Sequence, residues 1–384
     1  MIQGCIPTKD IGIYVNANTI QHQFESIANF SFKFDNFYTD IDKFLQDSSN
    51  LKFAGFHVPF PRNTIWIEDF RRLQPRVDHV FILCSELHNN IVEDLVQLDY
   101  PNVTMFLCGF IEHEFKYAKI EQWFDWFITS SYFYTHEKKN FLKDNLITSP
   151  KPYYFDILLG TKKPHRDLIH NYVIENNLAD KMIMTYHRRY NMNLQESDQY
   201  ILDEKEIEYL EENAAHRTSQ QIRYHGIRMV LSQVIPLSIY NQTYYSIVAE
   251  TCFENHFTFY TEKIVKPLLA GRLFIFVGSR YFLRNLKSLG FKTFDNVVDE
   301  SYDVEPDPET RWRMALDQMK KLCSMDPAEV QDKIKDAVEH NQRLLTYKEW
   351  ATRFDLTLHD YLLNYITTAH IDGDWQGSWP SIRT

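Results

Sequence analysis

Short apolar segments alternate with longer amphipathic segments along most of this 384-residue chain. The short segments are rich in β-branched and aromatic residues, as in buried strands, and the longer segments repeat apolar residues at helical spacing. Strands that alternate with helices are typical of α/β folds with mainly parallel sheets. The expected strands span residues 11–16, 78–85, 103–110, 126–131, 155–160, 182–186, 244–253, 273–278 and 291–294. The expected helices between them span residues 88–98, 165–177, 203–213, 261–271 and 280–290.

The polar stretch KDNLITSPKPYY, with Pro150 and Pro152, separates two series of strands. Because the length suits about two domains of ~150 residues, we predict two α/β domains that face a cleft. The N-terminal domain is expected over residues 1–149 and the C-terminal domain over residues 150–340. Helical patterns dominate the end of the chain, so residues 341–384 are expected to form a helical tail that packs back across the domains.

The composition is that of a globular protein, with 44% hydrophobic and 24% charged residues. The net charge of −11 makes nonspecific nucleic-acid binding unfavourable, because the chain as a whole repels phosphate backbones. The five cysteines lack the spacing of a metal site or a redox motif, and no segment resembles a signal peptide or a membrane span. The sequence therefore predicts a cytoplasmic protein with reduced cysteines and no membrane span.

The segment AETCFENHFTFYTEKIVKPLLAGRLFIFVGS, residues 249–279, is the most informative part of the chain. Thr261 is a good helix N-cap, which places Glu262 and Lys263 in the first helical turn. A helix that follows a parallel strand begins at the edge of the sheet where ligands bind. There, Glu262 suits a ribose diol and Lys263 suits a diphosphate. The structural alternative is that Glu262 only stabilises the helix dipole.

The segment from Glu250 to Phe294 resembles the donor-binding region of the fucosyltransferase family and its viral relatives. The matching motifs are FEN at 253–255, TEK at 261–263, LLAG at 268–271 and VGS at 277–279. The resemblance implies two Rossmann-like domains in the glycosyltransferase B architecture, with acceptor binding in the first and donor binding in the second. It also implies an inverting transfer of a sugar from a nucleoside diphosphate donor, without a metal ion.

By this resemblance, Glu262 holds the donor ribose, and Lys263 and Arg166 hold the diphosphate. The other candidate donor-binding residues are Glu254, Asn255, Tyr260 and Thr261. The loop HFTFY departs from the usual family pattern, so the donor remains open between a GDP-sugar and a UDP-sugar.

An inverting transferase needs a base that takes the proton of the acceptor hydroxyl. We expect it at the carboxyl end of a strand in the first domain. Glu86 follows the strand over 78–85 and is the first choice, while the alternatives, Glu112, His113 and Glu114, follow the strand over 103–110. An acidic residue in this place is also a common helix cap or loop charge.

The acceptor stays open. A glycan is the default, and a hydroxylated pyrimidine in DNA is the alternative that viral relatives raise. DNA binding would require a basic patch from Arg62, Arg71, Arg72, Lys138, Lys139 and Lys143. A third hypothesis is a non-catalytic protein of the same fold that binds a nucleotide sugar or a glycan.

Three weaker patterns each have a structural alternative. Asp372 and Asp374 form a D-x-D that binds a metal in other glycosyltransferases, but a plain turn is the favoured interpretation. The basic residues 187–189 suit a ligand or a solvent-facing loop. The aromatic residues that suit a nucleobase or, preferably, the core are Tyr224, His225, Tyr240, Tyr244 and Tyr245.

Overall fold

The computed structural model describes residues 11–17, 20–21, 36–49, 51–58, 65–148, 150–186, 190–192, 207–210 and 220–346. These residues fall into two compact units. Unit 1 contains the described residues up to 57 and residues 65–83, and unit 2 contains Val58 and the described residues from 84 to 346. The expected boundary between residues 149 and 150 lies within unit 2 and remains a prediction. The expected tail begins within a described helix, and its residues 347–384 lie outside the described residues.

Unit 1 is built on parallel strands in the order β2 (Asn36–Tyr38), β1 (Ile11–Val15), β3 (Leu51–His57) and β4 (His79–Cys84). Every residue of β4 is buried, as its continuous apolar run predicts. The helices of this unit are α2 (Ile41–Gln46) and α3 (Ile65–Leu73), followed by a 3-10 turn at Gln74–Arg76. The strands expected over 11–16 and 78–85 are confirmed, whereas β2 and β3 were not expected from the sequence.

The main sheet of unit 2 has the order β10 (Tyr190–Met192), β9 (Met182–Tyr186), β8 (Tyr153–Leu159), β14 (Thr243–Val248) and β16 (Phe274–Phe276). All neighbours are parallel except β10, which pairs antiparallel with β9 at the edge. The chain runs from β8 through α7 (Pro164–Glu175) to β9, and from β14 through α9 (Glu262–Leu269) to β16. These two connections leave in opposite directions, so right-handed crossovers place α7 and α9 on opposite faces of the sheet.

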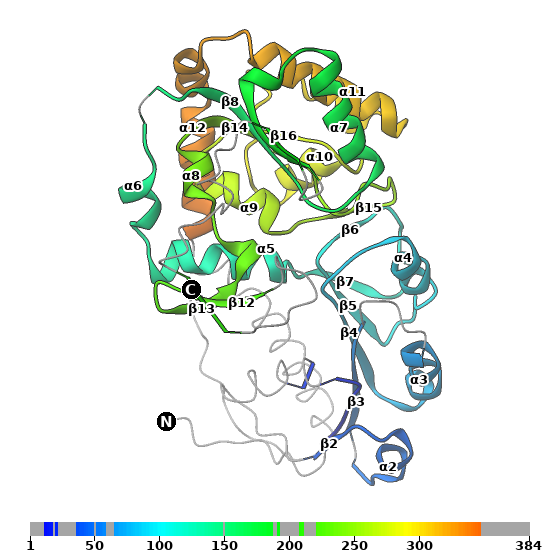
Figure 1. Cartoon of the computed structure of the whole chain (residues 1–384). Helices are drawn as coiled ribbons and strands as arrows, with labels where there is room; N and C mark the ends of the chain where they lie inside the picture. Colours follow the sequence, from blue (N-terminus) through cyan, green and yellow to red (C-terminus); the bar gives the residue numbers. More distant parts are fainter. Residues whose placement is uncertain are drawn as a thin grey trace. The chain divides into compact units, whose positions relative to one another are not determined.

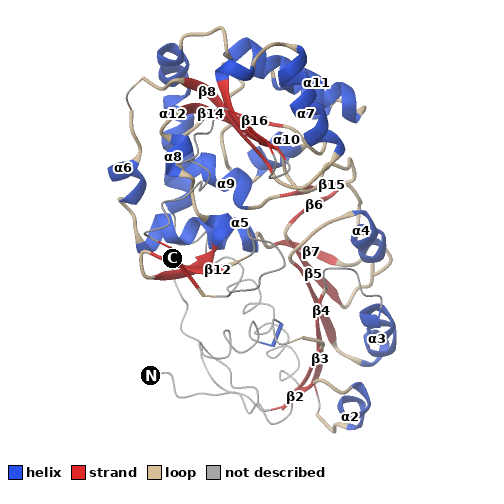
Figure 2. Ribbon diagram, in the orientation of Figure 1, coloured by secondary structure: helices blue, strands red, loops and turns tan. Residues whose placement is uncertain are grey.

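Two long helices complete the layers of unit 2 (Figure 1). Helix α11 (Pro308–Leu322) packs beside α7, and α12 (Pro327–Thr346) packs beside α9. Figure 2 shows the main sheet in red between these helices in blue. Unit 2 therefore has a doubly wound α/β core, which confirms the predicted mixed α/β class with parallel strands.

Unit 2 also contains elements outside this core. Strand β5 (Val103–Leu107) pairs in parallel with β7 (Lys119–Gln122), and β6 (Gly109–Ile111) pairs antiparallel with β15 (Phe257–Phe259). An antiparallel sheet contains β11 (Ile207–Tyr209), β12 (Gln221–Tyr224) and β13 (Ile227–Val230). The remaining α-helices are α4 (Asn89–Val96), α5 (Asp125–Tyr132), α6 (Phe141–Asn145), α8 (Leu237–Tyr240) and α10 (Phe282–Ser288). A π-helical turn lies at Phe133–Glu137, and 3-10 turns lie at Ala179–Lys181, Leu231–Gln233 and Glu300–Val304.

Three of the expected elements are wrong. The strand expected over 126–131 lies in helix α5, which packs against α9, because a short apolar run suits a buried helix as well as a strand. The helix expected over 203–213 contains strand β11, which is stabilised by pairing with β12. The segment 291–294 is irregular, although Phe291 and Phe294 are buried in the core.

The cysteines in the described part of the chain are free and buried, as predicted: Cys84, Cys108, Cys252 and Cys323. No helix in the described ranges has the length and apolar character needed to cross a membrane.

Candidate functional site

The order of strands in unit 2 marks one place as the best ligand site. Strands β8 and β14 are parallel neighbours whose following helices leave in opposite directions. In open α/β sheets, such a switch in direction leaves a crevice at the carboxyl ends of the two strands, and ligands bind there. Residues 160–166 follow β8, and residues 249–263 follow β14, so both segments meet at this edge. All residues of the candidate site belong to unit 2.

Thr261 caps helix α9, as predicted. Its backbone is extended, and its Oγ1 accepts a hydrogen bond from the backbone N–H of Lys263 at 3.2 Å. Helix α9 therefore begins at Glu262, and Glu262 and Lys263 occupy its first turn.

Glu250 lies directly beneath this cap and was not singled out from the sequence. The hydroxyl of Thr261 lies 2.9 Å and 2.8 Å from the two carboxylate oxygens of Glu250, to which it donates. The backbone N–H of Thr261 donates to the same carboxylate at 3.3 Å. Glu250 is only 1% exposed. The sequence signal for Glu250 was an acidic residue in an otherwise apolar strand pattern. The expected strand extended to residue 253, so the sequence did not show that β14 ends at Val248 and that Glu250 lies beyond it.

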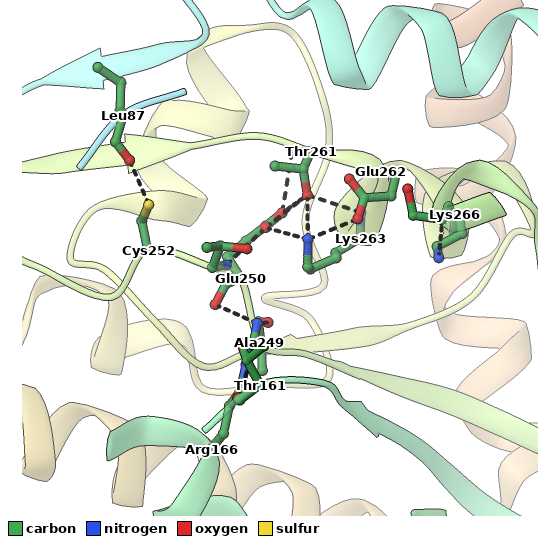
Figure 3. Close-up of polar contacts among 12 residues, drawn as sticks. Leu87, Thr161, Arg166, Ala249, Glu250, Cys252, Thr261, Glu262, Lys263 and Lys266 are labelled. Carbon is green, nitrogen blue, oxygen red and sulfur yellow. Dashed lines mark hydrogen bonds and ion pairs between the residues drawn. The ribbon is translucent and has the colours of Figure 1, made fainter. Parts of the chain in front are cut away.

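The Lys263 ammonium lies between two carboxylates (Figure 3). Its Nζ is 2.8 Å from Oε1 of Glu262 and 3.7 Å from Oε2 of Glu250. Burial lowers the pKa of Lys263, but the two carboxylates outweigh burial and the net pKa is raised. Burial favours neutral Glu262, yet Lys263 and Lys266 outweigh it and lower the pKa of Glu262. The Lys263–Glu262 pair is therefore fully charged at neutral pH, while 29% of the Lys263 side chain stays exposed.

Arg166 is buried at the start of α7 and binds backbone oxygens. Its Nη1 donates to the carbonyl and the hydroxyl of Thr161, both at 3.0 Å. Its Nη2 donates to the carbonyls of Ala249 and Glu250 at 3.1 Å and 3.3 Å. Nε has no hydrogen-bond partner among the described residues. Arg166 thus joins the start of α7 to the segment that follows β14.

Glu86 lies close to the same charges. Two thiols donate hydrogen bonds to the backbone at Glu86 and Leu87. Cys84 donates to the Glu86 carbonyl at 3.0 Å, and Cys252 donates to the Leu87 carbonyl at 2.7 Å. Burial raises the pKa of Glu86, Lys263 opposes this, and Glu262 adds to it, so that the net pKa is raised. The first-choice base therefore lies within electrostatic range of Glu262 and Lys263.

The alternative bases have different surroundings. Glu112 forms an ion pair with Arg284 at 2.6 Å, and its backbone N–H donates to the carbonyl of His256. Glu114 is exposed to solvent. Both residues are exposed, whereas Glu86 is half-buried.

The other three candidates for donor binding make contacts within the protein. Glu254 accepts a hydrogen bond from the backbone N–H of Phe253, and Asn255 bonds to Arg311 and to the carbonyl of Pro306. Tyr260 is fully buried and donates its hydroxyl to the carbonyl of Phe282 at 2.7 Å. These contacts position the segment between β14 and α9, a role that the sequence resemblance did not imply.

The structure also gives the positions of several weaker candidates for ligand binding. Tyr224, Tyr240 and Tyr245 are buried, in agreement with the preferred core interpretation. Arg71 and Arg72 belong to unit 1, whereas Lys138, Lys139 and Lys143 belong to unit 2. Within the described ranges, no group of three His, Cys, Asp or Glu side chains is arranged to hold a metal ion. The candidates outside the described residues are Arg62, Asp372, Asp374 and residues 187–189.

Comparisons with known proteins add one distant likeness. The sequence matches no protein-family model and no curated protein. Among solved structures, an alpha1,3-fucosyltransferase with GDP-fucose aligns with this chain at 10% sequence identity and a TM-score of 0.35. The alignment covers 88% of this chain and 94% of that chain. A likeness at this level does not establish a shared family or a shared function.

Proposed function

We propose that this protein transfers a sugar from a nucleoside diphosphate donor to a hydroxyl acceptor, with inversion at the sugar carbon. The observation that carries the proposal is the position of Lys263. Two carboxylates favour the charged form of its ammonium, which lies at the start of α9. This helix begins at the edge of the main sheet where the connections from β8 and β14 run in opposite directions. A charged group at such a place suits a diphosphate.

In the proposed reaction, the acceptor oxygen attacks the anomeric carbon and the bond from this carbon to the diphosphate breaks. The electron pair leaves with the diphosphate, whose growing negative charge is stabilised by Lys263 and by the positive end of the α9 dipole. Glu262, with 11% of its side chain exposed, is proposed to accept hydrogen bonds from the donor ribose.

Glu86 is the proposed base that accepts the proton of the acceptor hydroxyl. Its raised pKa supports this role, because a general base works best with a pKa near the operating pH. Nearby Lys263 opposes this rise in pKa, because its positive charge favours the ionised form of Glu86.

The proposal includes the glycosyltransferase B architecture, with residues 150–340 as the donor-binding domain. The doubly wound sheet of unit 2 supports a Rossmann-like domain there. A glycan is the proposed acceptor, because the net charge of −11 disfavours a DNA duplex.

The substitution Lys263→Ala tests the donor site. We expect a folded variant with turnover reduced by at least ~100-fold, since the ammonium stabilises charge that develops in the transition state. Donors are first chosen by thermal shift with GDP, UDP, ADP and their sugars, because a ligand at 100 times its Kd adds about 2.7 kcal/mol to the free energy of unfolding.

Lys335→Ala, on the exposed surface of α12, is the matched control and should keep full turnover. Near-normal turnover in folded Lys263→Ala would rule out the assigned donor site. Transfer is measured with EDTA present, and a need for added Mg or Mn would contradict the proposal that no metal takes part.

A further inference from the structure

We infer that Glu250 is a positioning residue that holds the Lys263 ammonium in place for the anionic group bound at the start of α9. The inference rests on the proposed function, because it concerns the same site. Glu250 is not expected to contact the donor, since its carboxylate is buried and both of its oxygens already accept hydrogen bonds.

The hydrogen bonds of Thr261 connect Glu250 to Lys263. Thr261 donates its hydroxyl proton to the Glu250 carboxylate, and the same Oγ1 accepts from the backbone N–H of Lys263. Nζ of Lys263 also lies 3.3 Å from this Oγ1. One carboxylate therefore orients both the backbone and the ammonium of Lys263.

The backbone of Glu250 connects the site to the other helix. Its carbonyl accepts hydrogen bonds from Nε2 of His165 at 3.0 Å and from Nη2 of Arg166 at 3.3 Å. The starts of α7 and α9 are thus both aligned on Glu250, at the point where the strand order of the sheet reverses.

A charge at this position exceeds what helix capping requires. The Thr261 hydroxyl alone satisfies the N–H of Lys263, and a buried carboxylate is unfavourable unless a cation compensates it. Glu262, with 11% of its side chain exposed, would turn toward the ribose in the proposed complex. When Glu262 is engaged, the buried carboxylate of Glu250, 3.7 Å from the Lys263 ammonium, keeps Lys263 oriented.

The test measures the pKa of Lys263 directly, through the rate at which an acylating reagent labels its neutral amine at different pH values. The reagent can reach the partly exposed side chain. The titratable and charged groups around the Glu250–Lys263 pair are Glu262, Lys266, Tyr260, His165, Arg166, Cys252, Glu86 and Lys163.

Glu250→Gln keeps the shape of the side chain and one of its two acceptor oxygens but removes its charge. We expect the pKa of Lys263 to fall, so labelling at pH 8 should be at least ~3-fold faster, since one pKa unit changes the neutral fraction about 10-fold. We also expect kcat to fall by at least ~10-fold, because small misplacements of a group that contacts the reacting atoms are costly. The alkaline limb of the rate profile should move to lower pH.

Asp303→Asn is the matched control, because Asp303 is another buried carboxylate that accepts from backbone N–H groups at the start of a helix, α10. It should reduce stability without changing the labelling of Lys263. If Glu250→Gln does not fold, Glu250→Asp carries the test and should shift the labelling in the same direction by a smaller factor.

Unchanged labelling of Lys263 in the Glu250 variant would overturn the inference. If labelling changes but neither the wild-type chain nor the variant binds a nucleoside diphosphate, Glu250 still positions Lys263 and the proposed function fails instead.

Discussion

Three carboxyl groups lie close to one ammonium at the edge of the unit 2 sheet, and their environments separate their pKa values. Burial raises the pKa of Glu86 and of Glu250, with Lys263 opposing it in both cases. At Glu262, Lys263 and Lys266 outweigh burial and lower the pKa. Carboxyl groups whose pKa values are driven apart in this way are suited to different tasks. Glu86 suits proton transfer and Glu262 suits permanent charge.

Glu86→Gln tests the proton-transfer role. Turnover should fall by at least ~100-fold while donor binding is retained, since the amide keeps the shape but cannot accept a proton. In the wild-type chain, turnover should rise with pH through the pKa of Glu86, above the usual ~4.3. Glu112→Gln and Glu114→Gln serve as controls and should remain active. Transfer that survives in Glu86→Gln and disappears in either control would move the base to that residue.

The pH dependence of stability tests the raised pKa of Glu86 independently of activity. Because its pKa is higher in the folded than in the unfolded chain, the folded state binds more protons between the two values. The contribution of Glu86 to the free energy of unfolding is therefore greatest at acidic pH and falls as the pH rises through the folded pKa. Glu86→Gln should be at least as stable as the wild-type chain at pH 7, measured by urea denaturation.

At the scale of elements, α9 has a defined start and a defined end. Thr261 caps its start, and Gly271, just after its end, has a φ of 64° in the left-handed region. A Cβ on Gly271 would lie 2.9 Å from Cγ1 of Val338 in α12. From the same helix, Gln342 donates to the carbonyl of Leu269 at 2.9 Å. The end of α9 therefore depends on close packing against α12.

Gly271→Ala should be more destabilising than Gly226→Ala. Gly226 also has a left-handed φ, of 84°, but no atom lies within 4 Å of its added Cβ. Gly226→Ala should cost about 1 kcal/mol of unfolding free energy from backbone strain alone. Gly271→Ala should add roughly 1–3 kcal/mol from overpacking. Equal losses in urea denaturation would contradict the close contact between α9 and α12.

At the scale of the whole molecule, one buried ion pair is central to the core of unit 2. Nη2 of Arg272 lies 2.7 Å from Oδ1 of Asp156, and both side chains are 4% exposed. Arg272 also donates to the carbonyls of Tyr240, Thr243 and Tyr245. Because Asp156 lies in β8 and Arg272 precedes β16, the pair joins the strands on either side of β14.

Arg272→Met should reduce the free energy of unfolding by about 3–5 kcal/mol, because it leaves a buried carboxylate without its cation. The control is Arg223→Met, which breaks an exposed ion pair with Glu208 and should cost no more than ~1 kcal/mol. Urea denaturation measures both variants. Losses of similar size would show that the Asp156–Arg272 pair is not essential to the core.

Local patterns in the sequence determined the α/β class, the main strands of unit 2 and the start of α9 at Thr261. These features depend on residues within a turn or two of each other, so the chain specifies them locally. The same patterns failed at α5 and β11, where packing against α9 and pairing with β12 decided between helix and strand.

Only the tertiary structure decided the surroundings of the candidate site. The thiol of Cys252 meets the carbonyl of Leu87 across 165 residues of sequence, and this contact holds the turn that carries Glu86. The place of Glu250 in the site likewise depends on tertiary structure, because β14 ends before Glu250 and the hydroxyl of Thr261 donates to its carboxylate. Burial and charge proximity arise from distant segments that fold together, so no local pattern reports them.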